Sequence, residues 1–471
     1  MEINGIRGNK GLGGLGGLGG FRGRLITAGD PGYDTARAVW NGAVDRRPRL
    51  IARCAGTADV AAAVRYARDR GLEISVRGGG HNVGGTAVCD GGVVVDLSDM
   101  RAVSVDPAGR TASVRGGALW GDVDRATGAH GLATTGGIVS HTGVGGLTLG
   151  GGIGFLMRRY GMAVDNLLAA EVVTAEGDTV RASAEENPDL FWALRGGGGN
   201  FGAVTGFRFA LHPLGPAVMA GAVFWAADDT AEVLRFYRDF AAAAPDELGT
   251  VVRLGTVPPL PAVPAHLHGR PAVAVACCHA GTVEEGERAV RELRCFGRPL
   301  ADLLAPVPYA DFQAGFDDTV PHGWHYHWKS THLTGLSDDV VAALAGHAYR
   351  AGSPRSYAAL FHLGGAVARV PADATAYAAR DVTHTIVIDG AWLPGEAAAH
   401  AAAETAWVRS FLHALAPHRA GGVYVNFLDA DDDAPRVREA YGEPAYRRLA
   451  QVKAKYDPDN AFHHNKNIRP E

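Results

Sequence analysis

The sequence is poor in cysteine and lysine, and it has no long apolar run. The 471 residues include 5 cysteines, and no two of them form a Cys-x-x-Cys pair or show the spacing of metal ligands. An odd number of cysteines in a long chain is typical of reduced thiols in the cytoplasm. Without a run of about 18 or more apolar residues, no transmembrane helix is expected. The cysteines are Cys54, Cys89, Cys277, Cys278 and Cys295.

The charge balance argues against a nucleic-acid-binding protein, and the N-terminus argues against a signal peptide. A net charge of −5 carries no basic footprint, which argues against nucleic acid as a partner. The N-terminus, MEINGIRGNKGLGGLGGLGGFRG, lacks the continuous apolar core of a signal peptide. We interpret residues 1–20 as a flexible glycine-rich tail, and we expect a cytoplasmic protein that does not bind a membrane.

The length predicts two or three domains, because 471 residues exceed what one hydrophobic core usually organises. Residues 50–54 (LIARC) suit a buried strand, residues 59–71 a helix that ends at Gly71, and residues 73–77 (EISVR) a second strand. Such a crossover places the following loop at the carboxyl end of a strand, where ligands commonly bind. Composition changes after about Pro213 and again near Gly421.

Three glycine clusters, Gly78–Gly85, Gly143–Gly154 and Gly196–Gly202, follow strands in the N-terminal half. Glycine lets backbone N–H groups approach phosphate oxygens, and it tolerates positive φ. The segment that begins at Gly143 departs from the Rossmann fingerprint, and no glycine loop ends in Lys-Ser or Lys-Thr as a Walker loop does. Together the clusters predict a dinucleotide cradle of another kind.

Several long motifs, in order, resemble the berberine bridge enzyme-like flavoproteins of the vanillyl-alcohol oxidase superfamily. They are VRGGGHNVGG, GVGGLTLGGGIGFLMRRYGMAVDNLLAAEVVTAEG, NPDLFWALRGGGGNFGAVTGF, YVNF and KAKYDPDNAFHHNKNI. The resemblance covers about residues 21–470 and points to a bacterial secondary-metabolism subset. It implies an α+β fold in which residues 21–213 form a two-subdomain PCMH-type FAD-binding domain. Residues 214–420 would form a substrate domain with an antiparallel sheet covered by helices, and residues 421–471 would return to the FAD domain.

The resemblance implies covalently bound FAD, attached through His81 to the 8α-methyl group. A neutral imidazole is a nucleophile near physiological pH, and glycine leaves room for the ring edge. Many relatives add a cysteine link in a Gly-x-Cys-Pro-x-x-Gly segment, where this chain has GIVSHTG with Val139 in the cysteine's place, so we expect a single attachment. The residues expected to hold FAD are Arg77, Gly78, Gly79, Gly80, His81, Asn82, Gly85, Thr142, Gly143, Gly145, Gly146, Gly150, Gly151, Gly152, Gly154, Val173, Asn426 and Asn465.

The expected catalytic residues are Tyr424, Thr142 and His141. Several relatives use a tyrosine of a Tyr-x-Asn-Tyr segment as the base, and here YVNF has Phe427 as its second aromatic, so only Tyr424 supplies a phenol. A phenol needs a pKa below its usual value of about 10 to act as a base. The alternative is a strand residue with a satisfied hydroxyl.

Comparison with the family at two other places bears on the catalytic mechanism. Plant members use a glutamate on a middle-domain strand, and the comparable segment here, residues 359–370, has no acid; His362 and Arg369 are its only ionisable groups. In relatives the residue at the position of Thr142 faces the flavin where oxygen approaches, and a small polar residue leaves that route open. His141 lies beside it, and Thr142 could alternatively only pack in a turn.

The segment HGWHYHWKSTH, residues 322–332, would place His325 and His327 on one face of a strand and Trp324, Tyr326 and Trp328 on the other. A metal site would need a third ligand such as His332, and commonly a carboxylate. We prefer a strand that lines a pocket with aromatic and polar groups. No metal is expected, and the substrate is expected to be aromatic or polyketide-like.

The sequence therefore predicts an FAD-dependent oxidase of a secondary metabolite, with hydride transfer to flavin N5, O₂ as acceptor and H₂O₂ as product. One alternative is an oxygenase of the flavin-N5-oxide type that acts on a polyketide intermediate. The other is a flavoprotein that binds and sequesters a drug. A nicotinamide dehydrogenase fits least. The expected partners are a small-molecule substrate and O₂, in a monomer or homodimer.

Overall fold

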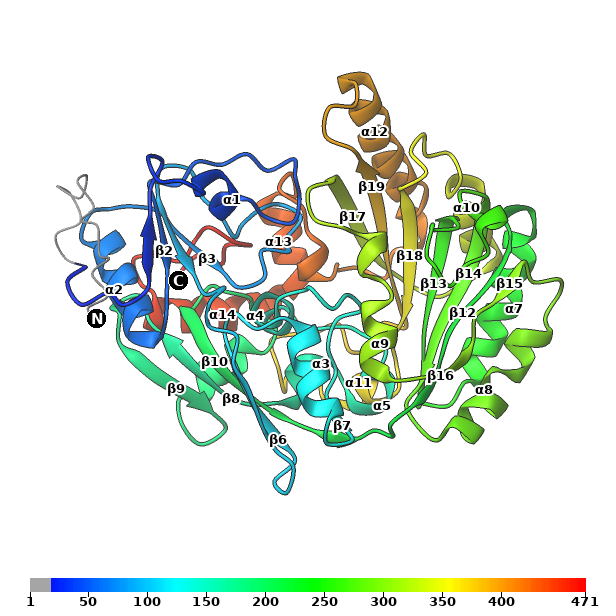
Figure 1. The fold of residues 1–471 in the computed structure, drawn as a ribbon, viewed down its shortest axis with the longest axis horizontal. Coiled ribbons are helices and arrows are strands. Elements are labelled where there is room, and N and C mark those ends of the chain that lie inside the picture. Colours follow the sequence, from blue (N-terminus) through cyan, green and yellow to red (C-terminus); the bar gives the residue numbers. More distant parts are fainter. Residues whose placement is uncertain (1–17) are drawn as a thin grey trace, which may run out of the picture.

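The computed structural model describes residues 18–471, which form two halves side by side (Figure 1). Most of the expected tail, residues 1–17, lies outside the described residues. Leu18, at the end of that tail, is buried against helix α2 (Thr57–Arg68) and the first sheet. The described structure therefore includes residues 18–20 before the predicted boundary at residue 21.

The first sheet is small and mainly parallel. Its strand order is β1 (Arg24–Ile26), β2 (Leu50–Arg53), β4 (Val93–Asp96), β3 (Ile74–Arg77), and β2 and β3 both run parallel to β4. Helix α2 makes the crossover, and Gly71, just beyond its end, has a φ of 59°. The predicted strand, helix and strand are confirmed, and the glycine loop follows the carboxyl end of β3.

The second sheet of the N-terminal half is antiparallel. Its order is β5 (Val103–Asp106), β6 (Thr111–Arg115), β10 (Ala203–Ala210), β8 (Leu167–Val173), β9 (Thr179–Ser183). Shorter elements connect the two sheets or cover this one: α1 (Tyr33–Arg37), α3 (Trp120–Gly128), β7 (Leu132–Ala133) with β11 (His212–Pro213), α4 (Val144–Leu149), α5 (Met157–Tyr160) and α6 (Pro188–Leu194). One hydrophobic core joins this sheet to the C-terminal segment.

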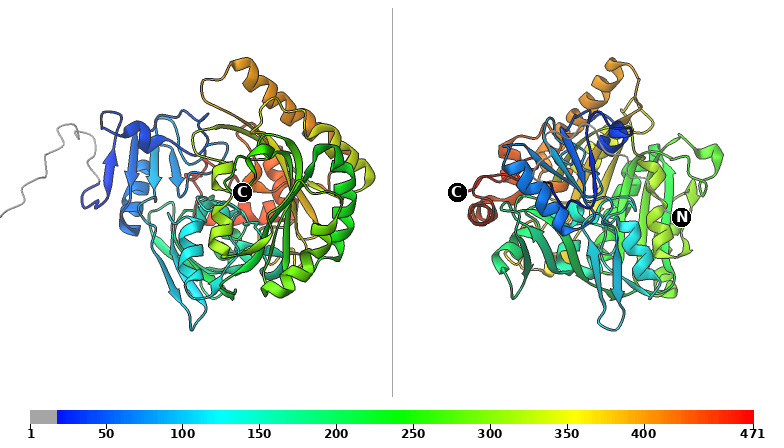
Figure 2. Two further views of the ribbon diagram at one scale, coloured as in Figure 1. Left: turned by 45° about the vertical axis from the view of Figure 1, so that its right-hand side comes forward. Right: turned by 60° about the vertical axis from the view of Figure 1, so that its left-hand side comes forward.

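The second half is one large antiparallel sheet with helices on one face (Figures 1 and 2). Its order is β15 (Ala301–Asp302), β12 (Val218–Ala226), β14 (Pro271–His279), β13 (Leu248–Thr256), β18 (Tyr357–His362), β19 (His384–Trp392), β17 (His325–Leu333), and β16 (Ala305–Val307) pairs with β12. The covering helices are α7 (Thr230–Ala243), α8 (Val283–Cys295), α10 (Asp338–His347) and α12 (Ala398–Ala414).

The opposite face of the large sheet turns toward the N-terminal half. Along β19, Ile386 and Ile388 pack in the core shared with the covering helices, whereas Val387 between them packs in a different core with Tyr424 and residues of the N-terminal half. This is the period-2 alternation of a strand buried on both faces. The α+β class and the helix-covered antiparallel sheet are as predicted.

The C-terminal segment lies against the N-terminal half (Figure 1). It contains α13 (Ala434–Tyr441) and α14 (Glu443–Tyr456). The ammonium group of Lys453 is fully buried and donates hydrogen bonds to Asn200 O (2.7 Å), Phe462 O (3.0 Å) and Asp457 Oδ2 (2.5 Å). One side chain of α14 thus ties the third glycine cluster to the end of the chain.

One local expectation is wrong. Residues 359–370 are not one strand: β18 ends at His362, Gly364 and Gly365 take positive φ, and α11 (Ala366–Arg369) follows. Tyr424, for which a strand position was the alternative, directly precedes a 3₁₀ turn, Val425–Phe427. Helix α4 lies inside the second glycine cluster, where backbone hydrogen bonding outweighs the low helix propensity of two glycines.

Two further expectations concern thiols and the membrane. All five cysteines are free, and Cys295 alone among them is exposed. Within residues 18–471, no helix combines the length and the apolar character needed to cross a bilayer.

We predict that Lys453→Met destabilises the protein by about 3–5 kcal/mol, because it leaves the fully buried Asp457 carboxylate without its charged partner. Lys455→Met, two residues further along α14, is the matched control, since Lys455 pairs with Asp189 at the surface and exposed pairs contribute about 1 kcal/mol or less. Urea unfolding followed by circular dichroism measures both. Equal free energies of unfolding for the two variants would contradict the assigned role of Lys453.

Candidate active site

A cavity of about 310 Å³ lies between the two halves. One wall consists of the glycine loops of the N-terminal half, and the other consists of side chains on the large sheet and in the C-terminal segment. The loops that line it come from all three predicted glycine clusters. The parallel-strand crossover therefore leads into a ligand cavity, as expected.

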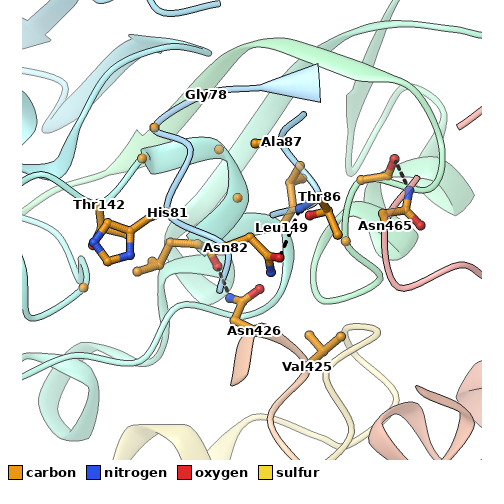
Figure 3. Close-up of a pocket in the computed structure, with 18 of the residues that line it drawn as sticks. Gly78, His81, Asn82, Thr86, Ala87, Thr142, Leu149, Val425, Asn426 and Asn465 are labelled. Atoms are coloured by element: carbon orange, nitrogen blue, oxygen red, sulfur yellow. Dashed lines mark hydrogen bonds between the residues drawn. The ribbon is translucent and has the colours of Figure 1, made fainter. Parts of the chain in front are cut away.

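Two of the glycine loops touch through their backbones. An added Cβ on Gly79 would lie 2.4 Å from Gly143 N, and one on Gly143 would lie 2.3 Å from Gly79 N. Real Cβ atoms do not approach backbone nitrogens so closely, so neither position accepts a side chain. Gly80 then turns with a φ of 68°, a conformation that glycine adopts without strain. These features present the next residue, His81, at the edge of the cavity (Figure 3).

The imidazole of His81 is held on two sides. It stacks on the fully buried Trp40 ring at 4.4 Å between centroids and 15° between planes. Its Nε2 lies 3.1 Å from Nδ1 of His141, so one of these nitrogens donates to the other. Desolvation by burial lowers the pKa of His81 well below 6.5, and His141 and His322 lower it further. His81 is consequently a neutral imidazole at physiological pH, which is the nucleophilic form.

His141 stands between two other imidazoles and one acid. Its ring centroid lies 5.0 Å from that of His81 and 4.9 Å from that of His322. Burial lowers the pKa of His141, while nearby Asp317 opposes that effect. Thr142, the next residue, lines the cavity. The predicted pair is thus divided, with Thr142 in the wall and His141 behind it in contact with His81.

Tyr424 faces the cavity with its phenolic oxygen accepting two hydrogen bonds. Gly152 N–H donates at 2.8 Å and the Asn426 side-chain amide at 2.9 Å. Burial raises the pKa of Tyr424 to about 12, although these two donors oppose the shift. The phenol is therefore protonated at neutral pH, and its own O–H remains free to donate to a ligand.

The sheet wall is mostly aromatic. Trp328, Tyr357, Phe361 and Val387 line it, and the Phe427 ring stands 5.7 Å from both Trp328 and Phe361. His362 does not join this wall: its Nε2 lies 3.1 Å from the Arg158 guanidinium. No Asp or Glu among the described residues lines the cavity. The aromatic lining was expected. Neither ionisable group of residues 359–370 lines the cavity: His362 is the last residue of β18, and Arg369 lies in α11.

Twelve of the predicted site residues line the cavity. They are Gly78, Gly79, Gly80, His81, Asn82, Thr142, Gly143, Gly145, Gly146, Tyr424, Asn426 and Asn465 (Figure 3). Figure 3 also shows Asn82 and Asn426, which come from distant parts of the sequence, projecting into the same space.

The other predicted residues support the wall from behind. Arg77 turns away to pair with the buried Asp96 at 2.5 Å. The positions Gly85, Gly150, Gly151, Gly152 and Gly154 adjoin protein atoms, and Val173 pairs in the second sheet. An added Cβ on Gly154 would lie 1.9 Å from Gly136 O, for example. These glycines permit close packing and do not line the cavity.

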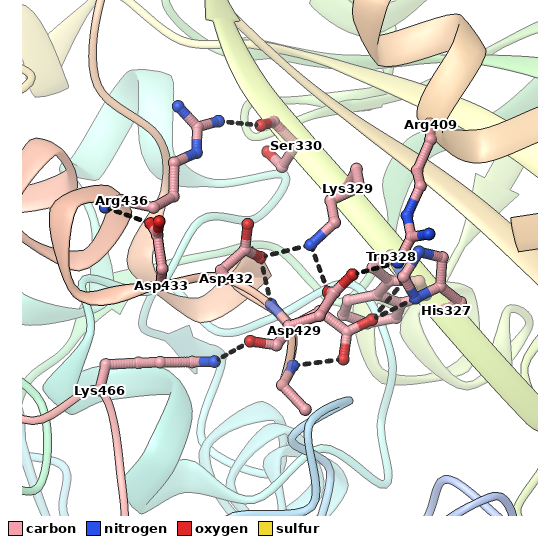
Figure 4. Close-up of polar contacts among 12 residues, drawn as sticks. His327, Trp328, Lys329, Ser330, Arg409, Asp429, Asp432, Asp433, Arg436 and Lys466 are labelled. Atoms are coloured by element: carbon pink, nitrogen blue, oxygen red, sulfur yellow. Dashed lines mark hydrogen bonds and ion pairs between the residues drawn. The ribbon is translucent and has the colours of Figure 1, made fainter. Parts of the chain in front are cut away.

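The histidines of residues 322–332 do not gather into one site. His325 and His327 share a face of β17, as expected, but His332 lies on the opposite face. His327 instead pairs with Asp429 at 2.9 Å (Figure 4), and Asp431 also lies near His327. The ammonium of Lys329 and the guanidinium of Arg409 already neutralise Asp431. This network joins the edge strand β17 to the C-terminal segment.

Many lining residues were not predicted, and two of them, Trp40 and Lys466, have specific contacts. Trp40 comes from a segment without glycine motifs, and its role emerges only when the chain folds over His81. Lys466 lies inside the quoted tail motif; its ammonium donates to Asp429 O at 2.5 Å, and burial lowers its pKa to about 8. A single lysine in a polar tail has no periodic signal that would mark it in advance.

Comparison with known proteins identifies the family. A family model for an FAD binding domain matches residues 48–183, and one for berberine and berberine-like proteins matches residues 423–469. The (R)-6-hydroxynicotine oxidase of Paenarthrobacter nicotinovorans is 35% identical over 468 residues, which are 96% of this chain and 97% of that protein. The chain belongs to the berberine bridge enzyme-like family of FAD-linked oxidoreductases. It is an FAD-dependent enzyme of the PCMH type.

Solved structures agree with this assignment. The crystal structure of 6-hydroxy-D-nicotine oxidase from Arthrobacter nicotinovorans matches with a TM-score of 0.84 and 33% identity, over 96% of this chain and 98% of that one. Glucooligosaccharide oxidase from Acremonium strictum, with a 6-S-cysteinyl, 8α-N1-histidyl FAD, matches with a TM-score of 0.84 and 25% identity, over 95% of this chain and 97% of that one.

The cavity of this flavoprotein fits FAD. Its glycine-rich wall offers backbone N–H groups without side chains between them, which suits a pyrophosphate. Where Gly146 lines the cavity, an added Cβ would meet no protein atom within 4 Å. The space beside it is therefore free for a ligand and is not filled by packing.

We predict that Gly146→Ala lowers the flavin content of the purified protein at least about fivefold at limiting FAD, because overpacking by a methyl group costs about 1 kcal/mol or more. Gly346→Ala is the matched control: it is also helical and its Cβ also meets nothing within 4 Å, but it lies far from the cavity. The absorbance ratio at 450 and 280 nm measures flavin content. Equal content in both variants would contradict a flavin beside Gly146.

Proposed function

We propose that the enzyme is an oxidase whose FAD is attached covalently to His81, and that it oxidises an aromatic or polyketide-like secondary metabolite. The observation that carries this proposal is the neutral imidazole of His81 at the edge of the glycine cavity, fixed between Trp40 and His141. When bound, the flavin supplies a two-electron acceptor for hydride.

His81 is proposed as the single point of attachment. In the glucooligosaccharide oxidase the FAD carries both a cysteinyl and a histidyl link. Val139 lines the cavity where the second link would require a cysteine, and it has no nucleophilic atom. None of the five free cysteines lies in the segment around it. The contact with His141 holds the His81 ring in one orientation.

Tyr424 is proposed as the catalytic phenol. The two donors on its oxygen, Gly152 N–H and the Asn426 amide, stabilise the phenolate that forms when a proton leaves it. Trp328, Phe361 and Phe427 provide a flat apolar wall that suits an aromatic substrate and excludes water. Tyr424 thus exchanges a proton with the substrate at the open side of its oxygen.

Molecular oxygen is proposed as the electron acceptor, with H₂O₂ as the product. Thr142, small and polar, lines the cavity and leaves room beside the ligand. The same feature supports a second candidate, an oxygenase that inserts one oxygen atom of O₂ into the substrate. Turnover under ¹⁸O₂ distinguishes them: stoichiometric peroxide supports the oxidase, and label in the product supports the oxygenase.

We predict that His81→Ala abolishes covalent attachment, so that acid precipitation releases all flavin into the supernatant. Mass spectrometry of the peptide that spans residues 78–85 checks the same bond in the wild type. His325→Ala, at a histidine outside the cavity wall, should keep its flavin in the pellet. Acid-stable flavin on the His81→Ala protein would rule out His81 as the attachment site.

We predict that Tyr424→Phe slows flavin reduction at least about tenfold, the lower end of general acid–base effects. Because burial raises the pKa of Tyr424 to about 12, the phenolate fraction grows with pH below that value. The wild-type rate should therefore rise from pH 7 to pH 10, and the variant should lose this rise. Anaerobic stopped-flow absorbance with aromatic alcohols and 6-hydroxynicotine measures both, and an unchanged rate would exclude Tyr424.

A further inference from the structure

A buried carboxylic acid lies beneath the side chains that form the sheet wall of the cavity. Asp389 is in the middle of β19, where it pairs with Trp328 of β17 and with Tyr357 of β18. Residues directly opposite each other on neighbouring strands share a face of the sheet. Trp328 and Tyr357 both line the cavity, as does Val387 two residues before Asp389. The side chain of Asp389 therefore lies on the cavity side of the sheet, although it does not line the cavity itself.

This carboxyl group has only weak hydrogen-bond partners. Asp389 is fully buried, and no donor meets either of its oxygens within strict hydrogen-bond geometry. Burial raises the pKa of Asp389 to about 7, while the indole N–H of Trp328 and the hydroxyl of Tyr357, which lie close enough to act on it as donors, oppose the shift. Buried polar groups in folded proteins are nearly always well paired, so a poorly paired acid beside a cavity points to a function.

Few charges surround Asp389. Arg253, on β13, places its guanidinium carbon 3.8 Å from the centroid of the Tyr357 ring and holds that ring from the far side. Four titratable or charged groups interact electrostatically with Asp389: Arg253, Tyr357, Tyr326 on β17, and Asp429 in the C-terminal segment. Burial lowers the pKa of Arg253 and raises the pKa of Tyr357.

The position of Tyr357 makes it the link between acid and ligand. Its ring lines the cavity, its face is fixed by Arg253, and Asp389 is its direct cross-strand neighbour. A phenolic hydroxyl can accept one hydrogen bond while it donates another. Since no acid among the described residues lines the cavity itself, Asp389 is the carboxylate through which the sheet wall can act.

We propose that Tyr357 and Asp389 recognise a hydroxyl group of the substrate. The hydroxyl of Tyr357 accepts a hydrogen bond from the substrate O–H and donates its own to the carboxylate of Asp389. Tyr357 touches the substrate, and Asp389 is a positioning residue that acts through it. The inference rests on the proposed function and names the polar group that the substrate presents to the sheet, opposite Tyr424.

The test compares two ligands that differ only in a hydroxyl group, 4-methylphenol and toluene. Ligand-observed NMR titration of the purified, flavin-containing full chain gives both dissociation constants at pH 8, where Asp389 is ionised. The wild type should bind 4-methylphenol at least about tenfold more tightly, because a site built to accept a hydroxyl discriminates against the analogue that lacks it. At pH 6 the preference should fall, because charge-assisted hydrogen bonds are about twice as strong as neutral ones.

Two variants distinguish the role of Tyr357 from that of Asp389. Tyr357→Phe should bind the two ligands with affinities within about twofold of each other, and Asp389→Asn should reduce the preference and remove its pH dependence. Asp124→Asn is the matched control, since Asp124 is another buried carboxyl whose pKa burial raises, to about 8, outside this cavity. It should retain the wild-type preference at both pH values.

Equal binding of the two ligands by the wild type would overturn the inference, and so would a pH-dependent preference that survives in Asp389→Asn. If Asp389→Asn does not fold, Tyr357→Phe still decides the matter, since it removes only a hydroxyl from a cavity-lining ring. The readout requires no turnover. A yellow protein with flavin on the peptide of residues 78–85 but no ligand preference refutes this inference alone, whereas a colourless protein refutes the proposed function.

Discussion

The contact between the backbones of Gly79 and Gly143 is the constraint on which the site depends. It brings the loop after β3 against the start of α4 at a distance that no side chain tolerates. Because the loops meet there, His81 emerges at the cavity edge, while Gly145 and Gly146 in α4 line the same wall. The glycine wall, the proposed cradle for FAD, therefore depends on the lack of side chains, and its shape follows from backbone packing.

The two walls of the cavity differ in chemistry for a physical reason. The glycine wall presents peptide groups, which can bind phosphate without carrying charge themselves. The sheet wall presents aromatic rings, which exclude water and match a flat ligand. Few charges enter the space between: Lys466 lines it with its ammonium held by Asp429 O, His81 is neutral, Tyr424 is protonated at neutral pH, and Asp389 does not line the cavity. In such a low-dielectric site, each remaining polar group acts strongly on a ligand.

Two other buried cations are paired with carboxylates outside the cavity lining. Arg77 and Asp96 pair behind the first glycine loop, and Lys453 and Asp457 pair behind the third. Both pairs are buried, and each also binds backbone carbonyl or N–H groups. Satisfied in this way, the buried charges hold the loops in place without altering the charge of the cavity.

Local patterns in the sequence were sufficient for the strand, helix and strand over residues 50–77 and for the glycine clusters. The strand and helix around residues 50–77 follow from apolar runs and from Gly71, whose positive φ ends the helix. The long motifs pointed to His81, Thr142 and Tyr424, which all line the cavity. The same reasoning failed at residues 359–370, where Gly364 and Gly365 break the strand even though the apolar pattern continues.

What the amino-acid sequence determined by itself was the presence of glycine where backbones must touch and of a histidine directly after such a contact, because those requirements are local. The tertiary structure alone decided which residues surround that histidine. Trp40 and His141 meet it only after distant segments pack together. Asp389 reaches the back of the cavity because strand register, which is set between strands and not along one, aligns it with Trp328 and Tyr357.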